Sequence, residues 1–553
     1  MQADVVVVGS GAAGMTAAIV AARSGLKVVL LEATSVFGGT TAFSGGGVWI
    51  PANHHQPELG VSDTKEEAQA YLQSVLGNFY DAEKIETYLD KAPEMLRYME
   101  ANTEVLLAAS TIPDYSPGAP GWKTGRCLLT ADYDGGRLGA DFERLRPPIP
   151  EMGLFHSMQV SPADAYRLQR WSSGVGEALW ALRRVGRYAL DRVKGSRGKH
   201  LANGNALAGR LLKSARDAGV ELINNARARS LVTEGDRVTG VTFERNGKEE
   251  VASAARGVVL ASGGFGANAE MRRKYVKQAD DGWSLQPEGS QGDGVNMGTA
   301  VGGTINETNA ANGIWVPASA MKRDDGTLAK FPSLAFDRHC PGQIMVDARD
   351  GKRFVDESFH YQNFGETTAE KGVTKIWQIA DSEAVSKYGL GMVKPAPFSP
   401  KPWVKKGYVF EAPTIGALAA KIGLDPAALE KTVADFNGYA DAGKDPDFGR
   451  GDNYYSAFMG DATHKPNPAL GALRKAPFYA LEVRPSDLST LAGLDTNAKA
   501  QVVGKDGNPI PGLYAAGLDN NTIMRGRYPG GGSSLGPAMT FGYIAARHLA
   551  EAA

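Results

Sequence analysis

The junction between an apolar run and a glycine turn near the start of the chain constrains the fold most. Residues 4–8 (DVVVV) form a short β-rich run that leads into GSGAAG at residues 9–14. An alanine-rich helical stretch follows, Gly25 ends it, and residues 27–31 (KVVLL) read as a second strand. A strand, a GxGxxG turn, a helix and a second strand form the pattern of a Rossmann-type dinucleotide site. The sequence therefore predicts an α/β fold that begins with a parallel βαβ unit.

Each glycine of this turn has a physical task. The first makes the tight turn, the second admits a pyrophosphate, and the third lets the helix pack on the strand. The acid that ends the second strand, about 20 residues later, suits the ribose hydroxyls of an adenosine. The predicted contacts are Gly9, Gly11, Ala12, Ala13, Gly14 and Glu32.

A second glycine segment, GGTTAFSGGG at residues 38–47, follows soon after this acid. NAD would not need another cradle at this place, whereas FAD continues past the first turn, so FAD is the predicted cofactor. We find no second dinucleotide fingerprint, which disfavours NAD(P)H as the partner and favours a quinone, a carrier protein or another soluble electron acceptor. The contacts predicted in this segment are Gly38, Gly39, Thr40, Thr41, Ser44, Gly45 and Gly46.

The C-terminal region supplies a matching feature. A small-residue strand end (LYAAG, residues 513–517) precedes YPGGG at 528–532, and an apolar helix then starts at 533–535. Glycines let the backbone approach a flat ligand, and a helix start presents free N–H groups and partial positive charge. We predict a flavin held by both ends of the chain, with the helix start near Ser534 and Leu535 stabilising negative charge on the reduced ring.

The order of these segments resembles the succinate dehydrogenase/fumarate reductase flavoproteins over the whole chain. The segments that carry the resemblance include a strand–turn–strand at 227–242 and GVVLASGGFG at 257–266. The resemblance places the first near adenine and returns the second, with the LYAAG strand, to the flavin. Membrane-bound members tether FAD through a histidine, but Thr40-Thr41 stands at that place, so noncovalent FAD is expected. The residues implied are Ala228, Ser262, Gly263, Gly264 and Gly517.

Within that superfamily the chain resembles the 3-ketosteroid dehydrogenases, chiefly the Δ1 branch. YPGGG followed by LGPAMTFGY (535–543) carries the resemblance. Three further regions agree with it: PDY at 113–115, RHCPG at 338–342 with GKRFVDES at 351–358, and APFYA at 476–480. The resemblance implies an FAD-dependent oxidoreductase of CH–CH groups that desaturates the 1,2-bond of a 3-ketosteroid or a similar fused-ring ketone.

The chemistry explains why such a site needs phenols. A proton must leave C2 and a hydride C1, so the ketone oxygen must be polarised by hydrogen-bond donors. The resemblance assigns this clamp to the hydroxyl of Tyr528 and the N–H of Gly532. It assigns removal of the C2 proton to Tyr361, with Tyr115 tuning that base.

Two cations beside the clamp leave an alternative open. Arg525 and Arg527 could hold a carboxylate, which would suit a fumarate reductase-like reductase of α,β-unsaturated acids. A phosphate contact or a surface salt bridge is the simpler role for the same pair. A non-enzymatic FAD-stabilised binding or redox-sensing protein is a further alternative, although a sensor would not need the YPGGG clamp.

Length and composition limit the remaining choices. A chain of 553 residues is too long for one core, and a net charge of −1 gives no case for nucleic acid. The only cysteines are Cys127 and Cys340, and the histidines lack metal spacing, so no metal site is predicted. The expected architecture is a Rossmann-like FAD-binding domain with an inserted α+β substrate (catalytic) domain. Its segments are 1–104, 185–300 and 488–553 for FAD, and 105–184 and 301–487 for substrate.

Residues 164–200 have an unusual composition. They carry nine Lys/Arg against three acids, together with Trp171, Trp180 and several leucines. A basic amphipathic stretch with tryptophans is typical of a membrane-surface element, and a peripheral membrane contact would suit a lipid-dissolved substrate. A core-packed helix with a basic solvent face is the simpler interpretation of the same stretch. With no signal-like segment before residue 4, we expect a cytoplasmic protein that is either free or associated with a membrane.

Overall fold

The computed structural model describes residues 1–171, 173–276, 283–334 and 336–551. Contacts divide the chain into two compact units. Unit 1 comprises Met1–Lys277, Gln286–Gly313 and Ser489–Ala553, and unit 2 comprises Gln278–Leu285 and Ile314–Leu488. Each unit is described separately.

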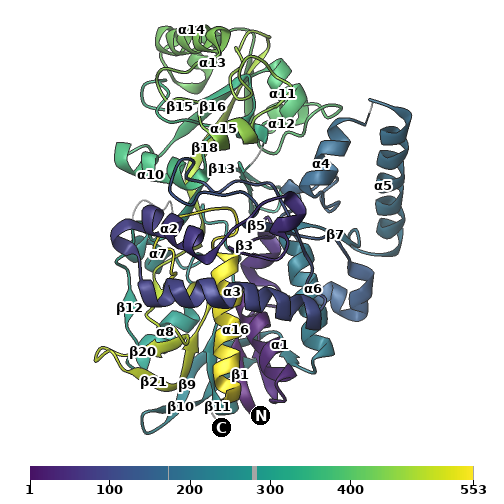
Figure 1. Ribbon diagram of the computed structural model, residues 1–553. Coiled ribbons are helices and arrows are strands. Elements are labelled where there is room, and N and C mark those ends of the chain that lie inside the picture. The colour runs from purple at the N-terminus through teal and green to yellow at the C-terminus, as the bar shows by residue number, and fades with distance from the viewer. Residues whose placement is uncertain (172, 277–282, 335, 552–553) are drawn as a thin grey trace. The chain divides into compact units, whose positions relative to one another are not determined.

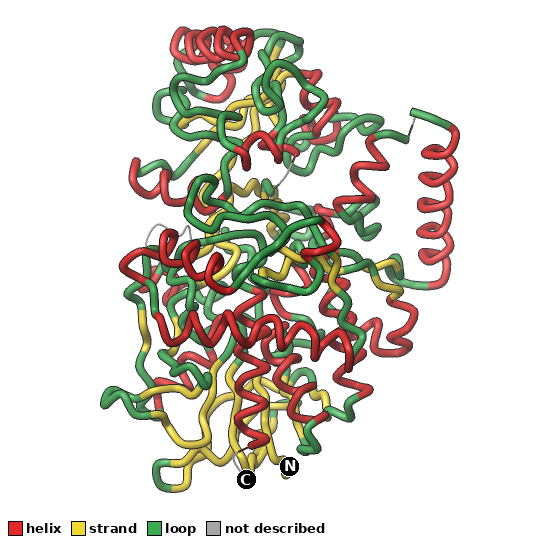
Figure 2. Tube along the Cα trace, viewed as in Figure 1, coloured by secondary structure: helices red, strands yellow, loops and turns green. Residues whose placement is uncertain are grey.

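Unit 1 is built on an eight-stranded sheet with the order β20-β21-β11-β1-β2-β8, in which β10 pairs with β11 and β9. β1 runs parallel to β2 and β11, and β11 runs parallel to β21. In Figure 2 the strands of this sheet gather near the end where both termini lie. The strands are β1 (Gln2–Val8), β2 (Val28–Leu31), β8 (Glu221–Ile223), β9 (Ala226–Glu234), β10 (Arg237–Arg245), β11 (Lys248–Leu260), β20 (Gln501–Val503) and β21 (Pro509–Ala515).

Helices from both ends of the chain pack together on this sheet. α1 (Ala12–Arg23) and α16 (Leu535–Glu551) lie side by side, and a Cβ on Gly542 would lie 2.5 Å from the carbonyl oxygen of Ala13 (Figure 1). α3 (Ala82–Asn102) also packs on α16, and Tyr543 donates a hydrogen bond to Glu94 at 2.7 Å. The helices that follow the N- and C-terminal glycine motifs thus pack together within unit 1.

The rest of unit 1 surrounds these helices. A three-stranded sheet, β3-β5-β4, follows the second glycine segment. The remaining helices and strands of unit 1, this small sheet included, are β3 (Gly47–Trp49), α2 (Lys65–Leu76), β4 (Leu107–Ala108), β5 (Cys127–Thr130), β6 (Tyr133–Asp134), α4 (Pro162–Gln169), α5 (Val175–Lys194), β7 (His200–Leu201), α6 (Asn203–Asp217), α7 (Ala269–Tyr275), α8 (Asp293–Ala300), β12 (Ile305–Asn306) and β19 (Gly493–Leu494).

Unit 2 is an α+β arrangement around a sheet with the order β14-β13-β18-β16-β15, and β17 pairs with β18. The pairs β15–β16, β16–β18 and β17–β18 are antiparallel. Its strands are β13 (Gly313–Lys322), β14 (Leu328–Pro332), β15 (Gln343–Asp347), β16 (Ile376–Asp381), β17 (Val409–Ala412) and β18 (Phe478–Thr490). Its helices are α9 (Phe336–His339), α10 (Tyr361–Lys371), α11 (Ser382–Tyr388), α12 (Lys401–Lys405), α13 (Ile415–Ile422), α14 (Pro426–Ala442) and α15 (Tyr454–Met459).

The local elements predicted from the sequence are present. The first βαβ unit, the strand–turn–strand around Gly235 and the C-terminal helix all form. The units divide the chain differently from the five expected segments, because residues 105–184 lie in unit 1. Backbone pairing explains this, since β5 lies between β3 and β4, and Arg210 of α6 donates to the carbonyls of Ala131 and Asp132. Among the described residues, no helix is long and apolar enough to cross a membrane.

Candidate functional site

The first glycine turn connects β1 to α1 and has both crowded and open positions. Gly9 has a φ of 103°, and a Cβ there would lie 2.2 Å from the carbonyl oxygen of Ala261. A Cβ on Gly14 would lie 2.0 Å from the carbonyl oxygen of Gly9. At Gly11 the nearest such atom would be Thr41 Oγ1 at 3.7 Å, so this position borders open space. Gly9 and Gly14 therefore permit close packing, while Gly11 leaves room for a ligand.

Glu32 follows β2 directly and is a buried carboxylate beside this turn. It accepts hydrogen bonds from Ser10 Oγ at 2.5 Å and from the backbone N–H and hydroxyl of Thr34 at 2.9 and 2.8 Å. Ser10 Oγ in turn accepts from the N–H of Gly38 at 3.0 Å. The carboxylate predicted to meet a ribose thus also links the first glycine turn to the second glycine segment.

The second glycine segment forms a short 3-10 helix, Gly39–Phe43, that lies before β3. Gly38, just before this helix, and Gly39, its first residue, both have positive φ. Thr41 Oγ1 accepts from the N–H of Ala12 at 2.9 Å, which ties the segment to the start of α1. Thr40 Oγ1 is buried and has no hydrogen-bond partner among the described residues. A Cβ on Gly45 would have nothing within 4 Å. An orphaned buried hydroxyl beside open space fits a cradle that a polar cofactor completes.

The rest of this segment is held by its own hydrogen bonds. Ser44 Oγ donates to the carbonyl of Thr41 at 2.8 Å and accepts from the N–H of Gly46 at 3.1 Å. A Cβ on Gly46 would lie 2.5 Å from the backbone of Asn203 at the start of α6. Ser44 and Gly46 therefore shape the loop, and Gly45 between them remains exposed to open space.

Asp519, a buried aspartate not identified from the sequence, connects the two glycine turns that follow β11 and β21. Asp519 accepts from the N–H and hydroxyl of Ser262 at 2.5 and 3.0 Å and from the N–H of Gly264 at 3.0 Å. Burial raises the pKa of Asp519 to about 6. Gly263 and Gly517 both have positive φ, as tight turns after β11 and β21 require. The only sequence signal for Asp519 was an acid two residues after Gly517.

The remaining predicted cofactor residues lie in the same unit. Ala228 is buried in β9 opposite Phe243. Ser534 accepts from the N–H of Ala538 in the first turn of α16, which begins at Leu535. A small hollow, partly open to solvent, lies beside this helix start, and its lining includes Gly517, Asn520, Thr522, Ser534, Pro537 and Ala538. Unit 1 thus contains the predicted cofactor residues, and the orphaned Thr40 hydroxyl and the open position at Gly11 fit a polar cofactor such as FAD.

Two of the three predicted tyrosines lie against each other in unit 1. The rings of Tyr115 and Tyr528 have centroids 5.7 Å apart and an interplanar angle of 36°. The carbonyl of Pro529 accepts from the N–H of Tyr115 at 2.8 Å and from the hydroxyl of Tyr71 at 2.6 Å. The structure therefore brings the PDY loop and the YPGGG segment together through rings and backbone.

Glycines are required in YPGGG because other groups crowd it. A Cβ on Gly530 would lie 2.7 Å from Trp49 Nε1, and one on Gly531 would lie 3.1 Å from Cys127 Sγ. Gly532 has a φ of 89°, and its carbonyl accepts from the N–H of Trp49 at 3.2 Å. The segment is pressed against β3 and β5, so it has little freedom to move.

A buried ion-pair network lies directly behind this contact. Arg126 donates to Asp114 at 2.7 Å and to both oxygens of Asp63 at 2.7 and 2.8 Å, and all three side chains are almost fully buried. Asp114 also accepts from Trp49 Nε1 at 2.7 Å. Burial raises the pKa of Asp114 to about 7, although Arg126 opposes this shift. Asp114 precedes Tyr115, so the network fixes the backbone that carries this tyrosine; sequence reasoning quoted Asp114 but gave it no role.

Tyr361 lies in unit 2 as the first residue of α10. It is partly buried against the apolar cluster of Leu285, Val316 and Ala318. The helix start is capped by His360, whose Nδ1 accepts from the N–H of Asn363 at 3.2 Å. Burial, reinforced by Arg338, lowers the pKa of His360 to about 3, so this imidazole is neutral near neutral pH.

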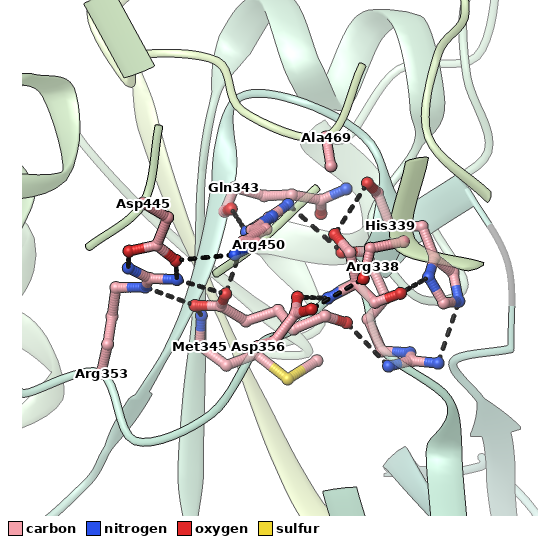
Figure 3. Close-up of polar contacts among 12 residues, drawn as sticks. Arg338, His339, Gln343, Met345, Arg353, Asp356, Asp445, Arg450 and Ala469 are labelled. Atoms are coloured by element: carbon pink, nitrogen blue, oxygen red, sulfur yellow. Dashed lines mark hydrogen bonds and ion pairs between the residues drawn. The ribbon is translucent and has the colours of Figure 1, made fainter. Parts of the chain in front are cut away.

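The RHCPG and GKRFVDES segments form the support for this helix start (Figure 3). Glu357 accepts from Arg353 twice at 2.8 Å and from Arg450 at 3.2 Å. Burial alone would raise the pKa of Glu357, but these two guanidinium groups hold it below its usual range. Arg338 donates to the carbonyls of Glu357 and Phe359 at 2.7 Å each. These family segments therefore fix the backbone that leads into Tyr361.

Arg525 and Arg527, the two cations next to the clamp, are both half-buried. Arg525 has a φ of 51°, and its carbonyl accepts from the N–H of Ala310 at 2.8 Å. With the Asn521 amide turned to satisfy its neighbours, the amide oxygen accepts from Arg525. Arg525 therefore has a protein partner of its own within unit 1.

Comparisons with known proteins identify the family of this chain. A family model described as FAD binding domain matches residues 4–535. A 4-oxocyclohex-2-ene-1-carboxylate 5-dehydrogenase of Sinomonas cyclohexanicum is 39% identical and covers 100% of this chain and 94% of its own length. A 3-oxosteroid 1-dehydrogenase of Mycolicibacterium smegmatis is 36% identical and covers 100% and 97%.

A solved structure extends the match to the fold. The 3-ketosteroid delta1-dehydrogenase of Sterolibacterium denitrificans, in complex with 1,4-androstadiene-3,17-dione, has a TM-score of 0.92 and 34% identity, and the match covers 100% of both chains. The chain therefore belongs to the FAD binding domain family and, within it, to the FAD-dependent dehydrogenases of CH–CH bonds that include the 3-oxosteroid 1-dehydrogenases.

Proposed function

We propose that this protein catalyses the FAD-dependent 1,2-desaturation of 3-ketosteroids or a similar fused-ring ketone. The observation that carries the proposal is the Tyr115–Tyr528 contact beside the glycines that lead into α16. The 3-oxosteroid 1-dehydrogenases that match the whole chain support the substrate class.

In this proposal the ketone oxygen accepts hydrogen bonds from the Tyr528 hydroxyl and the Gly532 N–H. These two donors acidify the C2 proton by stabilising negative charge on the oxygen. Tyr361, as phenolate, removes that proton, and Tyr115 tunes the base. Unit 2 supplies Tyr361, so we propose that it acts as the substrate domain.

We propose that FAD is bound without a covalent link and accepts the hydride that leaves C1. Thr40 and Thr41 at the second glycine segment support noncovalent binding, since neither side chain is a usual site of flavin attachment. Gly11, Gly45 and the hollow beside Gly517 offer the space, and the start of α16 offers positive charge. An external acceptor such as a quinone then reoxidises the protein.

The decisive experiment is an anaerobic screen of flavin bleaching at the visible absorbance band. A 3-keto-4-ene steroid and its 3-hydroxy counterpart form a matched pair, because only the ketone can use the clamp. Bleaching by the ketone alone supports the proposal. A flavin that no ketosteroid bleaches contradicts the steroid assignment.

A second candidate is the dehydrogenation of a small cyclic keto acid. The 39%-identical relative of Sinomonas cyclohexanicum is named for a 4-oxocyclohexene carboxylate, and Arg525 and Arg527 could hold such a carboxylate. The same screen separates the two, with 4-oxocyclohexanecarboxylate as a further probe and fumarate, added to the reduced protein, as the probe for a reductase. Arg525→Gln and Arg527→Gln should each weaken keto-acid binding but leave ketosteroid turnover near normal.

A further inference from the structure

α5 presents its apolar side chains to solvent. Val175, Leu179, Leu182, Leu190 and Val193 are 77%, 61%, 70%, 65% and 84% exposed. At about 100° of rotation per residue, all five lie within an arc of about 80° on the helix surface. We call these five residues the α5 stripe.

The opposite face of α5 carries the polar contacts. Arg184 donates to Asp164 of α4 at 3.1 Å and to the carbonyl of Gln159 at 2.9 Å. Arg167 of α4 lies over the Trp180 ring at 4.2 Å and pairs with Glu177 at 3.0 Å. Figure 1 shows α5 running beside α4. A surface helix normally buries its apolar face, so the orientation of α5 is the reverse of the usual one.

Other exposed apolar side chains gather near α5. Of the fifteen large apolar side chains that are exposed among the described residues, eight lie between residues 152 and 193. The three outside the stripe are Met152, Phe155 and Trp171. Phe155 stacks on Tyr188, a buried residue on the face of α5 opposite to the stripe, with ring centroids 6.1 Å apart. The stripe itself is contiguous along α5 and marks an interaction surface, because single apolar residues are normal on a surface but contiguous patches are not.

The charges beside the stripe indicate what covers it. α5 has five basic and two acidic residues. Both acids are engaged within unit 1: Glu177 pairs with Arg167, and Asp191 accepts from the N–H of Lys199 at 2.8 Å. Arg183, Arg192 and Lys194 are exposed beside the stripe, as is Arg187, which is 3.5 Å from Asp134. The accessible face is therefore apolar along its centre and positive along its edges.

We propose that the α5 stripe docks on an anionic lipid bilayer, with its apolar side chains inserted below the headgroups. An apolar centre with basic edges matches the order of layers at such a surface, acyl chains below and negative headgroups above. A second copy of this chain would instead bring two positive edges together, which opposes association through the stripe.

The test uses the full-length protein loaded with its flavin. Its sedimentation is measured with vesicles of phosphatidylcholine alone and of phosphatidylcholine mixed with phosphatidylglycerol, at low and high salt. The protein should sediment with the mixed vesicles at low salt, and high salt should release most of it. A variant with Leu179→Ser, Leu182→Ser and Leu190→Ser should lower the bound fraction at least tenfold, since it removes most of the inserted area.

Two controls isolate the stripe. Leu106→Ser with Val251→Ser removes exposed apolar side chains of unit 1 outside the stripe and should leave vesicle binding unchanged. Arg183→Gln, Arg187→Gln and Lys194→Gln should reduce binding to anionic vesicles and weaken its salt dependence. Because all these side chains are exposed, thermal unfolding of every variant should match that of the parent protein.

Three outcomes would overturn the proposal. The parent protein could fail to sediment with either vesicle, or the triple serine variant could sediment as the parent does. Sedimentation equilibrium without lipid could also show a dimer that the triple serine variant loses, in which case a second copy covers the stripe. None of these readouts depends on catalytic activity, so they are independent of the substrate assignment.

Discussion

The Tyr115 and Tyr528 rings lie 5.7 Å apart, and the carbonyl of Pro529 accepts a hydrogen bond from the N–H of Tyr115. The backbone that carries one tyrosine is thus fixed to the backbone that carries the other. Tyr71 donates to the same carbonyl, and burial raises the pKa of Tyr71 well above its usual value, so it stays a donor. Ring packing and backbone hydrogen bonds therefore both contribute to the position of the two tyrosines.

Tyr528→Phe should leave FAD bound and the fold intact but lower turnover about 100-fold, the scale of losing one oxyanion donor. Flavin content and steady-state turnover measure the two effects. Tyr514→Phe is a matched control, because that hydroxyl bonds His548 near the end of α16 rather than the clamp. Near-normal turnover in Tyr528→Phe would mean that another donor polarises the ketone.

Asp114→Asn should change how stability depends on pH. Burial raises the pKa of Asp114 from 3.8 to about 7, so folding takes up a proton between these values. The stabilisation that Asp114 contributes is fully present below the pKa of this group in the unfolded chain. It is lost as pH rises through about 7, the pKa of Asp114 in the folded protein. The asparagine variant does not titrate, so the parent protein should lose stability relative to it, on the order of 2 kcal/mol, between pH of about 5 and about 8.

Urea unfolding across this range measures the difference. Asp141→Asn is the matched control, because Arg216 and Arg144 outweigh burial and the pKa of Asp141 is lowered, and it lies outside the Asp114 network. Stability from Asp141 is present above its unfolded pKa and is lost only as pH falls below it. The stability gap between parent and Asp141→Asn should therefore stay constant across the range. A constant gap for Asp114→Asn as well would show that Asp114 is ionised throughout.

Local patterns in the sequence were sufficient to predict the nucleotide-binding elements. The β1–α1–β2 unit, the β9–β10 hairpin and α16 each follow from strand runs, glycine turns and a helix start within a short window. Their joint position could be predicted because both ends carried matching glycine motifs. The family resemblance assigned Tyr115 and Tyr528 to one site but related Tyr115 to Tyr361, and no local pattern predicts the Tyr115–Tyr528 contact between residues so far apart.

The supporting charges could not be predicted in this way. Asp63 precedes α2, whereas Asp114 and Arg126 both lie in the segment between β4 and β5, and their pairing with Asp63 depends on how β3 and β5 fold together. The same holds for Arg353, Glu357 and Arg450 in unit 2. For α5, the periodicity of its leucines revealed an apolar face but not its direction, because that is decided by the ion pairs with α4.

Acid precipitation of the purified yellow protein should release all of the FAD into the supernatant. We expect this release because Thr40 and Thr41 occupy the place of a tethering histidine, so FAD is proposed to bind without a covalent link. Glu32→Ala should weaken FAD retention by losing a ribose contact and the bonds to Ser10 and Thr34. Glu32→Gln keeps an acceptor for Ser10 and should retain more FAD than Glu32→Ala. Flavin that stays with the pellet would contradict noncovalent binding.

Tyr361→Phe should separate proton abstraction from carbonyl polarisation. Tyr361 is proposed to act as a phenolate and Tyr528 as a neutral donor, so they need opposite protonation states. In Tyr361→Phe a ketosteroid should still bind and perturb the flavin spectrum, because the Tyr528 clamp is intact. Flavin reduction should be nearly absent, and exchange of the C2 proton with deuterated solvent should be lost with it. Stopped-flow absorbance and mass spectrometry of recovered steroid measure these two losses.

Phe359→Leu is a suitable control for Tyr361→Phe, because it changes a neighbouring ring in the loop that Arg338 holds but leaves the Tyr361 hydroxyl in place. It should retain C2 proton exchange and flavin reduction near the parent rates. Tyr361→Phe with unchanged exchange would mean that a different residue takes the proton. Tyr115 would then be the first residue to test, because its ring already lies against Tyr528, and Tyr115→Phe should abolish the exchange that Tyr361→Phe had left intact.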